Sequence, residues 1–232
     1  MGDGAPVVIL EAGRNNGAGA WRAVMPLLTR HVRVVAYDRA GIGGSDPAPD
    51  PAIVARQVSD LASLITELNA APCVLAGHSW GGVLVQLLAF RHPGLVAGLI
   101  LVDPADERMA GALPRLMRWG IRAARLHRND ELTGGDTAAN AAALRELRDS
   151  PRPFLDIPVV VLSASRGFPR RFRLRWTGWQ AELAATTSEG RHVVVQGSGH
   201  NIPADRPDVV ADAIMRVVAQ VRERTDLSAL RI

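Results

Sequence analysis

The stretch Gly77-His78-Ser79-Trp80-Gly81 follows the apolar run Cys73–Ala76 and opens an apolar segment from Gly82 to about Phe90. This is G-x-S-x-G in the order strand, turn, helix. A serine on such a tight turn projects its hydroxyl above a sheet, and glycine on either side tolerates the close backbone contacts. The pattern therefore predicts Ser79 as a nucleophile. The alternative is a glycine-rich turn without chemical function.

Apolar runs of strand length alternate with segments of helical period on both sides of this motif. Most of the runs are continuously apolar, which is typical of strands covered on both faces of a parallel sheet. The alternation predicts a doubly wound, mostly parallel sheet in a single α/β domain spanning residues 1–232. The predicted strands are Val7–Glu11, Val32–Tyr37, Cys73–Ala76, Leu99–Val102, Pro158–Ser163 and His192–Gln196.

Two helices are predicted by their apolar stripes. One lies between Pro51 and Asn69, and the other contains residues 210–221, with Pro207 at its first position. Residues 104–156 break the alternation, because they have a helical pattern without a strand. They are predicted to form a small helical lid inserted between two strands.

Composition limits the class of protein. Hydrophobic residues make up 47% of the 232 residues and charged residues 22%, as in a globular protein. No apolar run is long enough to cross a membrane, the N-terminus lacks signal-peptide features, and Cys73 is the single cysteine. We therefore expect a soluble cytoplasmic protein. All 27 basic residues are arginine and most are scattered among acids, so no nucleic-acid partner is expected.

A nucleophilic serine needs a base to accept its proton. In this arrangement the partners follow in the order serine, acid, histidine. The favoured base is His200 in Gly197-Ser198-Gly199-His200, a glycine-rich loop directly after the last predicted strand. The other histidines lie inside the motif itself, at a strand start, at helix ends or in basic surface-like segments. A purely structural role for His200 is the alternative.

The acid is harder to place. Many such enzymes carry it after the penultimate strand, but no Asp or Glu lies between Ile157 and Ala181. Asp103 ends the strand that follows the nucleophile unit, so it is expected at the carboxyl edge of the sheet. There it could accept the N–H of His200 and fix its tautomer. The alternative is that Asp103 caps the first helix of the lid.

Two backbone N–H groups are expected to stabilise the oxyanion. One belongs to Trp80, after the serine, and the other most simply to Arg14, in the loop after the first strand. Gly13 in that loop could also serve only to permit a tight turn. Trp119 and Trp176 are candidate walls of an apolar substrate pocket, although tryptophans also fill cores. Arginine runs in and after the lid suggest an acidic substrate or, more simply, solvated helix faces.

Four segments together resemble the α/β-hydrolase family, particularly its compact bacterial esterase, haloperoxidase-like and lactonase-like members. They are Glu11–Arg14, Tyr37–Ser45, Gly77–Gly82 and Gly197–His200. The resemblance implies Ser79 as nucleophile, His200 as base, and Asp103 in place of the more usual acid position. It also implies that the turn at Asp38-Arg39 is structural. The family usually begins with a hairpin for which this chain has no room, so either the sheet is truncated to about six strands or the reading frame starts late. An exposed strand edge would then invite dimerisation or instability, and a monomer or a homodimer is expected.

These observations predict a serine hydrolase that cleaves a carboxylic ester, lactone or thioester of a small-molecule acyl substrate. No metal site and no cofactor are expected, since no histidine or carboxylate pair has metal-site spacing and the glycines at 41–44 do not form a dinucleotide fingerprint. An aspartate-nucleophile mechanism is excluded by Ser79. The alternatives are a C–C bond hydrolase, cyclase or acyltransferase, or a binding protein on the hydrolase scaffold.

Overall fold

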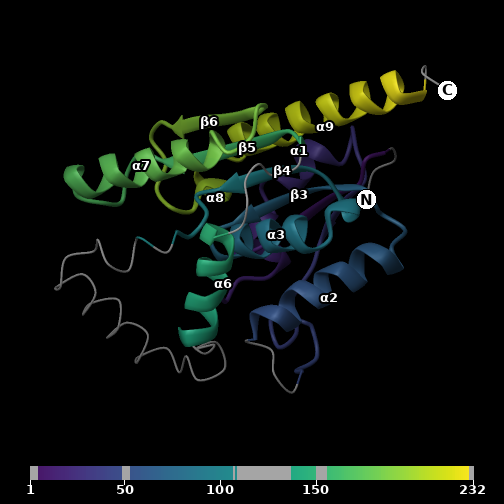
Figure 1. Ribbon diagram of the computed structural model, residues 1–232, viewed down its shortest axis with the longest axis horizontal. Helices are drawn as coiled ribbons and strands as arrows, with labels where there is room; N and C mark the ends of the chain where they lie inside the picture. Colours follow the sequence, from purple (N-terminus) through teal and green to yellow (C-terminus); the bar gives the residue numbers. More distant parts are fainter. Residues whose placement is uncertain (1–4, 49–52, 107, 109–136, 150–155, 230–232) are drawn as a thin grey trace.

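The structure, a computed structural model, describes residues 5–48, 53–106, 108, 137–149 and 156–229. Within them, six strands form one fully parallel sheet in the order β2-β1-β3-β4-β5-β6. The chain starts at β1, next to one edge of the sheet, adds β2 at that edge, and then crosses back to place β3 to β6 in succession on the other side of β1 (Figure 1). The predicted doubly wound parallel sheet is therefore confirmed.

All six predicted strands are present, and their bounds differ slightly from the prediction. The second strand is shorter than predicted, while the fourth begins three residues earlier, because Ala97 and Gly98 follow Val96 into the sheet. The strands are β1 (Val8–Glu11), β2 (Val34–Ala36), β3 (Cys73–His78), β4 (Val96–Val102), β5 (Val159–Ala164) and β6 (Gly190–Val195).

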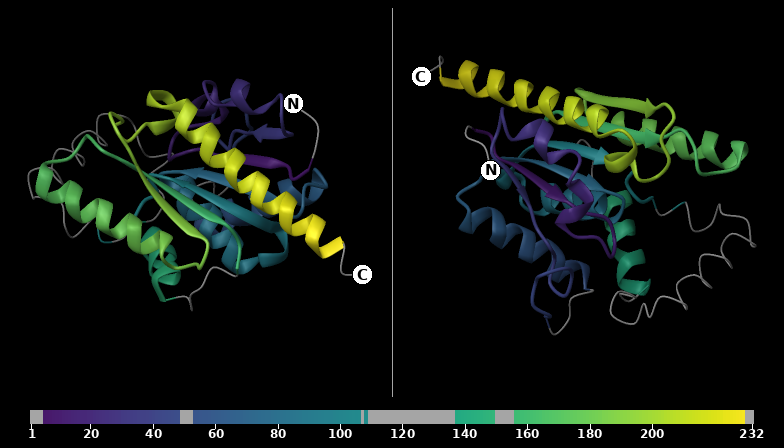
Figure 2. Two further views of the ribbon diagram at one scale, coloured as in Figure 1. Left: turned by 90° about the horizontal axis from the view of Figure 1, so that it is seen from above. Right: turned by 180° about the vertical axis from the view of Figure 1, so that it is seen from behind.

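Helices cover both faces of the sheet, as Figures 1 and 2 show. One face packs against α2 (Val54–Glu67), α3 (Trp80–Arg91), α6 (Thr137–Asp149) and the end of α7 (Arg170–Ala184). The other packs against η1 (Ala18–Trp21), α1 (Met25–Leu28), α8 (Ile202–Asp205) and the long α9 (Pro207–Ala229). A short η2 (Pro93–Leu95) precedes β4. The final helix begins at Pro207, as predicted.

Strand alternation divides the core between the two faces. In β3, Leu75 packs toward α2 and α3, whereas Val74 and Ala76 pack toward α9. Because helices cover both sides, every residue of β3 and β5 is buried. This explains why these strands appear in the sequence as continuous apolar runs.

The segment predicted as a lid lies mostly outside the described residues, Trp119 included. Its described helix, α6, packs through Ala143 and Leu147 into the core beside α2 and α3. Arg91 of α3 forms a bidentate ion pair with Glu146 of α6. In the part of the chain that the structure describes, no helix is long and apolar enough to cross a membrane.

Candidate active site

The predicted nucleophile stands at the carboxyl edge of the sheet, between β3 and α3. Ser79 has φ 53° and ψ −114°, a conformation that L residues rarely adopt. Its N–H donates to the carbonyl of Val102, and its own carbonyl accepts from the N–H of Ala105. The strained turn is thus held by the end of the neighbouring strand, β4.

The glycines around Ser79 leave no room for a side chain. A Cβ atom at Gly77 would lie 2.5 Å from the carbonyl oxygen of Gly81, and one at Gly81 would lie 2.5 Å from that of Ala12. Both contacts are with backbone, which cannot move aside cheaply. The close packing that the motif predicts for its glycines is therefore present here.

Asp103 follows β4 directly and contacts His200 across 97 positions of sequence. Its Oδ2 lies 2.6 Å from Nδ1 of His200. The carboxylate is fully buried, whereas the imidazole is 52% exposed. Asp103 itself has φ 43°, and its N–H donates to Leu162 of β5, so the turn is fixed by the next strand as well.

Two further donors hold the other oxygen of this carboxylate. Oδ1 of Asp103 accepts from the N–H of Ala164 at 3.0 Å and from Nε1 of Trp176 at 2.7 Å. Trp176 lies in α7 and is only 2% exposed. Both oxygens of Asp103 are thus occupied by these partners, while the nearby Asp106 accepts the N–H of Arg108.

His78 links the serine turn to the histidine loop. Its Nε2 lies 2.9 Å from the carbonyl oxygen of His200, and the two rings lie 4.9 Å apart. Because a carbonyl only accepts, Nε2 of His78 must carry the hydrogen. Burial lowers the pKa of His78 to about 4, which keeps the ring neutral near pH 7.

Within the described residues no hydrogen bond joins the hydroxyl of Ser79 to the ring of His200. The two loops are linked through His78, the residue before Ser79, whose ring contacts His200. Catalytic hydrogen bonds are often long in ligand-free structures. The structure therefore brings Asp103 and His200 together, and His78 connects this pair to the serine turn.

The loop after β1 lies against the serine turn. A Cβ atom at Gly13 would lie 3.4 Å from Cβ of Ser79 and 3.2 Å from Nδ1 of His78. The guanidinium of Arg14 stacks over the indole of Trp80 at 4.1 Å, and Nε1 of Trp80 donates to Gln57. The two residues predicted for the oxyanion hole are thus in contact next to the serine.

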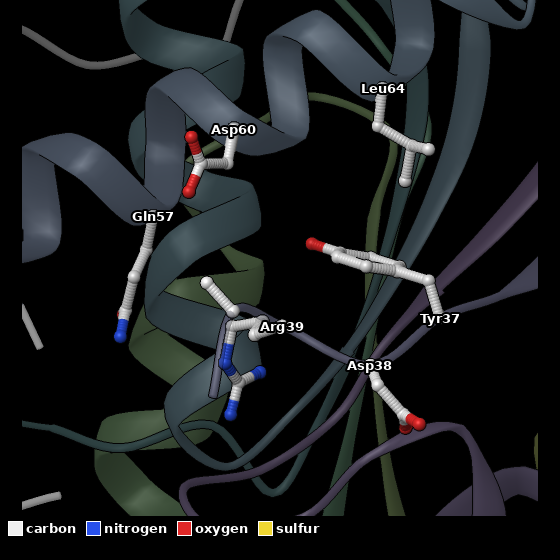
Figure 3. Close-up of a pocket in the computed structure, with 7 residues that line it drawn as sticks. Tyr37, Asp38, Arg39, Gln57, Asp60 and Leu64 are labelled. Carbon is white, nitrogen blue, oxygen red and sulfur yellow. The ribbon is translucent and has the colours of Figure 1, made fainter. Parts of the chain in front are cut away.

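A buried polar cluster supports the same loop from its other side. Glu11 accepts from both Tyr37 and Arg39, and Arg39 also donates to the carbonyls of Ala12 and Gly13. A cavity of about 170 Å³ lies next to this cluster and is lined by Arg39 together with Gln57 and Asp60 of α2 (Figure 3).

Sequence reasoning missed three of these contacts. His78 was assigned no role, Trp176 was predicted only as a pocket wall, and Arg39 was interpreted as part of a turn. The G-H-S pattern and the Asp38-Arg39 pair were visible, but their partners lie far away in sequence. Among the described residues, no group of three or more His, Cys, Asp or Glu side chains could hold a metal ion.

Comparison with known proteins gives a family match over most of the chain. The model of the "Alpha/beta hydrolase family" matches residues 8–213. The chain is 26% identical over 220 residues to "Uncharacterized protein YqjL" of Bacillus subtilis (strain 168), covering 93% of this chain and 85% of that protein. It is also 34% identical over 100 residues to "Putative carbamate hydrolase RutD" of Pantoea ananatis, covering 43% of this chain and only 36% of that relative.

A solved structure supports the architecture. The thermophilic esterase from Thermogutta terrifontis superposes with a TM-score of 0.68 at 23% identity, covering 95% of this chain and 92% of the esterase. At this level of identity the similarity concerns the fold.

Proposed function

The chain belongs to the alpha/beta hydrolase family, and from this we propose that it is a serine hydrolase of carboxylic esters, lactones or thioesters. One observation carries the proposal. A fully buried carboxylate, Asp103, holds Nδ1 of the exposed His200 at 2.6 Å, and His78 links His200 to the strained turn of Ser79. A buried acid, an imidazole and a serine at one sheet edge form a nucleophile with its base and orienting group.

The proposed reaction begins when Nε2 of His200 accepts the hydroxyl proton of Ser79. The serine oxygen bonds to the substrate carbonyl carbon, whose π electrons move to the oxygen. His200 then gives the proton to the leaving group as the bond to it breaks. Water, deprotonated by the same imidazole, releases the acid and restores the serine. Asp103 accepts the Nδ1 hydrogen throughout and stabilises the imidazolium.

The developing oxyanion would rest on the backbone N–H groups of Trp80 and Arg14. Trp80 is the first residue of α3, so its N–H is one of the unpaired donors at the start of that helix. Arg14 lies in the loop that packs against Ser79 through Gly13. We propose that Trp119, in the lid predicted at residues 104–156, and Trp176 line the pocket for the acyl group.

The alternative of a binding protein without turnover rests on the empty acid position after β5 and on the missing hairpin. Asp103 contacts His200 from the end of β4, and the N–H of Ala164 in β5 donates to Asp103. These contacts support the proposal that Asp103 serves as the acid, which favours catalysis.

The experiment is a panel of p-nitrophenyl esters of short and long acids, lactones, thioesters and a phenyl carbamate. We expect turnover of at least one class by the wild-type protein, none by Ser79→Ala, and wild-type rates for Ser59→Ala, which changes an exposed serine of α2. Unchanged turnover by purified, folded Ser79→Ala would refute the assignment.

A further inference from the structure

The pair formed by Glu11 and Arg39 is a buried ion pair outside the proposed triad. Their side chains are 1% and 8% exposed. Burying two charges is costly, and a buried ion pair is often no more stabilising than apolar residues of the same size. A contribution to stability alone therefore explains this ion pair poorly. The other hydrogen bonds of Arg39 indicate a second role.

Arg39 contacts two consecutive backbone carbonyls. Its Nη1 donates to the carbonyl of Ala12 at 2.7 Å, and its Nη2 donates to that of Gly13 at 2.6 Å. In a trans peptide the N–H points opposite to the carbonyl of the same unit. Because both carbonyls face Arg39, the N–H groups of Gly13 and Arg14 face away from it.

The serine turn lies close to this same segment. Gly13 packs against Ser79 and His78, and the carbonyl of Ala12 packs against Gly81. The N–H of Arg14 is one of the two donors proposed for the oxyanion. The direction of this N–H is therefore set by how the carbonyl of Gly13 is held.

We propose that Arg39, anchored by Glu11, is a positioning residue that aims the loop N–H groups of Gly13 and Arg14 at the oxyanion formed on Ser79. This inference rests on the proposed function. It gives the Asp38-Arg39 sequence a role in transition-state stabilisation beyond forming a turn.

The chemistry of the guanidinium suits this role. Its planar fork presents several fixed donors at once, so that one side chain can bond Glu11 and both carbonyls together. A lysine could keep the ion pair but could not reproduce the two aligned bonds. Figure 3 shows the guanidinium turned away from Asp60, a carboxylate that lines the cavity and is paired with Arg56.

Tyr37→Phe provides a matched control. The hydroxyl of Tyr37 donates to the other oxygen of Glu11, so its loss weakens the same buried cluster. It leaves both bonds from Arg39 to the loop carbonyls in place. A role in stability alone would make Tyr37→Phe and Arg39→Lys similar in activity, whereas a positioning role separates them.

The test measures kcat and KM with the best ester, together with the inhibition constant of a trifluoromethyl ketone bearing the same acyl chain. That ketone forms an oxyanion on the serine, so its affinity reports transition-state stabilisation. For Arg39→Lys we expect kcat to fall on the order of ten- to hundredfold, with KM within about threefold and the ketone weakened in proportion to kcat. Tyr37→Phe should lower the melting temperature and leave kcat and the ketone affinity close to wild type.

Glu11→Gln provides a second variant in case Arg39→Lys fails to fold. This variant keeps Arg39 but removes the charge that anchors it. We therefore expect kcat and the affinity for the ketone to fall in proportion to each other, by less than in Arg39→Lys. A folded Arg39→Lys or Glu11→Gln protein with wild-type kcat and ketone affinity would overturn the inference. A wild-type protein that turns over no ester and binds no ketone would instead overturn the proposed function.

Discussion

Nδ1 of His200 and Oδ2 of Asp103 lie 2.6 Å apart, although the two residues are 97 positions apart in sequence and belong to different loops. The carboxylate is buried and receives three donors, of which His200 is the only exposed one. A buried acid saturated in this way can do little besides orient the imidazole. This contact predicts the effects of replacing Asp103, the residues that hold the site together, and a glycine of the serine turn.

Replacing the acid tests its orienting role. Asp103→Asn keeps the size of the side chain but removes the charge that stabilises the imidazolium and the acceptor that fixes its tautomer. We expect kcat to fall roughly 10⁴-fold, the loss known for the equivalent change in a serine protease triad. Steady-state kinetics check this, with Asp106→Asn as a control at a nearby carboxylate that pairs with Arg108. An active Asp103→Asn enzyme would assign the acid elsewhere.

The indole of Trp176 supports the acid from α7. Trp176→Phe keeps most of the buried aromatic volume and removes the N–H that donates to Oδ1 of Asp103 at 2.7 Å. Because a hydrogen bond to a charged group is worth about 1.5–3 kcal/mol, we expect stability to fall by about that amount and kcat to fall on the order of tenfold. Thermal melts and kinetics measure both. Trp179→Phe, which leaves this bond intact, should change kcat little; equal effects in the two variants would argue against the support.

His78 should make stability depend on pH. Its pKa in the folded protein is about 4, against 6.5 for an unperturbed imidazole. Above pH 6.5 the ring is neutral in both states, whereas between pH 6.5 and 4 the unfolded chain binds a proton that the folded chain excludes. Stability is thus lost as the pH falls through this window, by on the order of 3 kcal/mol.

The variant His78→Gln isolates this contribution. A glutamine amide can still donate to the carbonyl of His200 but cannot be protonated. We expect urea unfolding of the variant to show a flatter dependence on pH between 6.5 and 4 than that of the wild-type protein. Parallel curves would mean that His78 does not titrate as proposed.

The serine turn should not tolerate a methyl group. In Gly81→Ala the new Cβ would lie 2.5 Å from the carbonyl oxygen of Ala12. We expect a loss of about 1–3 kcal/mol in unfolding free energy and a displaced loop after β1. Gly178→Ala is the matched control, because nothing lies within 4 Å of its Cβ position on the exposed face of α7. It should raise stability by up to about 1 kcal/mol.

Local sequence patterns predicted the fold well. Apolar runs, most of them continuous, marked all six strands, and the apolar stripe of residues 54–65 marked the buried face of α2. Asp103 could be predicted because the end of a parallel strand fixes the edge of the sheet at which its side chain lies. The same reasoning placed His200 after β6. In each case the signal lay within a few neighbouring residues.

The supporting contacts could not be predicted, because they depend on how distant elements pack. Trp176 reaches Asp103 only because α7 lies against β5, and His78 reaches the loop of His200 across 122 positions. In the sequence Arg39 resembles a turn residue, whereas in the structure it donates to the carbonyls of Ala12 and Gly13. No local periodicity encodes such partners. They arise from tertiary packing.

The most direct measurement is covalent labelling of the folded wild-type protein with a fluorophosphonate, followed by peptide mapping by mass spectrometry. An activated serine should give one phosphonyl adduct, on the peptide that contains Ser79. The adduct should be absent in Ser79→Ala and form much more slowly in His200→Gln. A folded wild-type protein that remains unlabelled, or an adduct that persists in Ser79→Ala, would contradict Ser79 as the nucleophile.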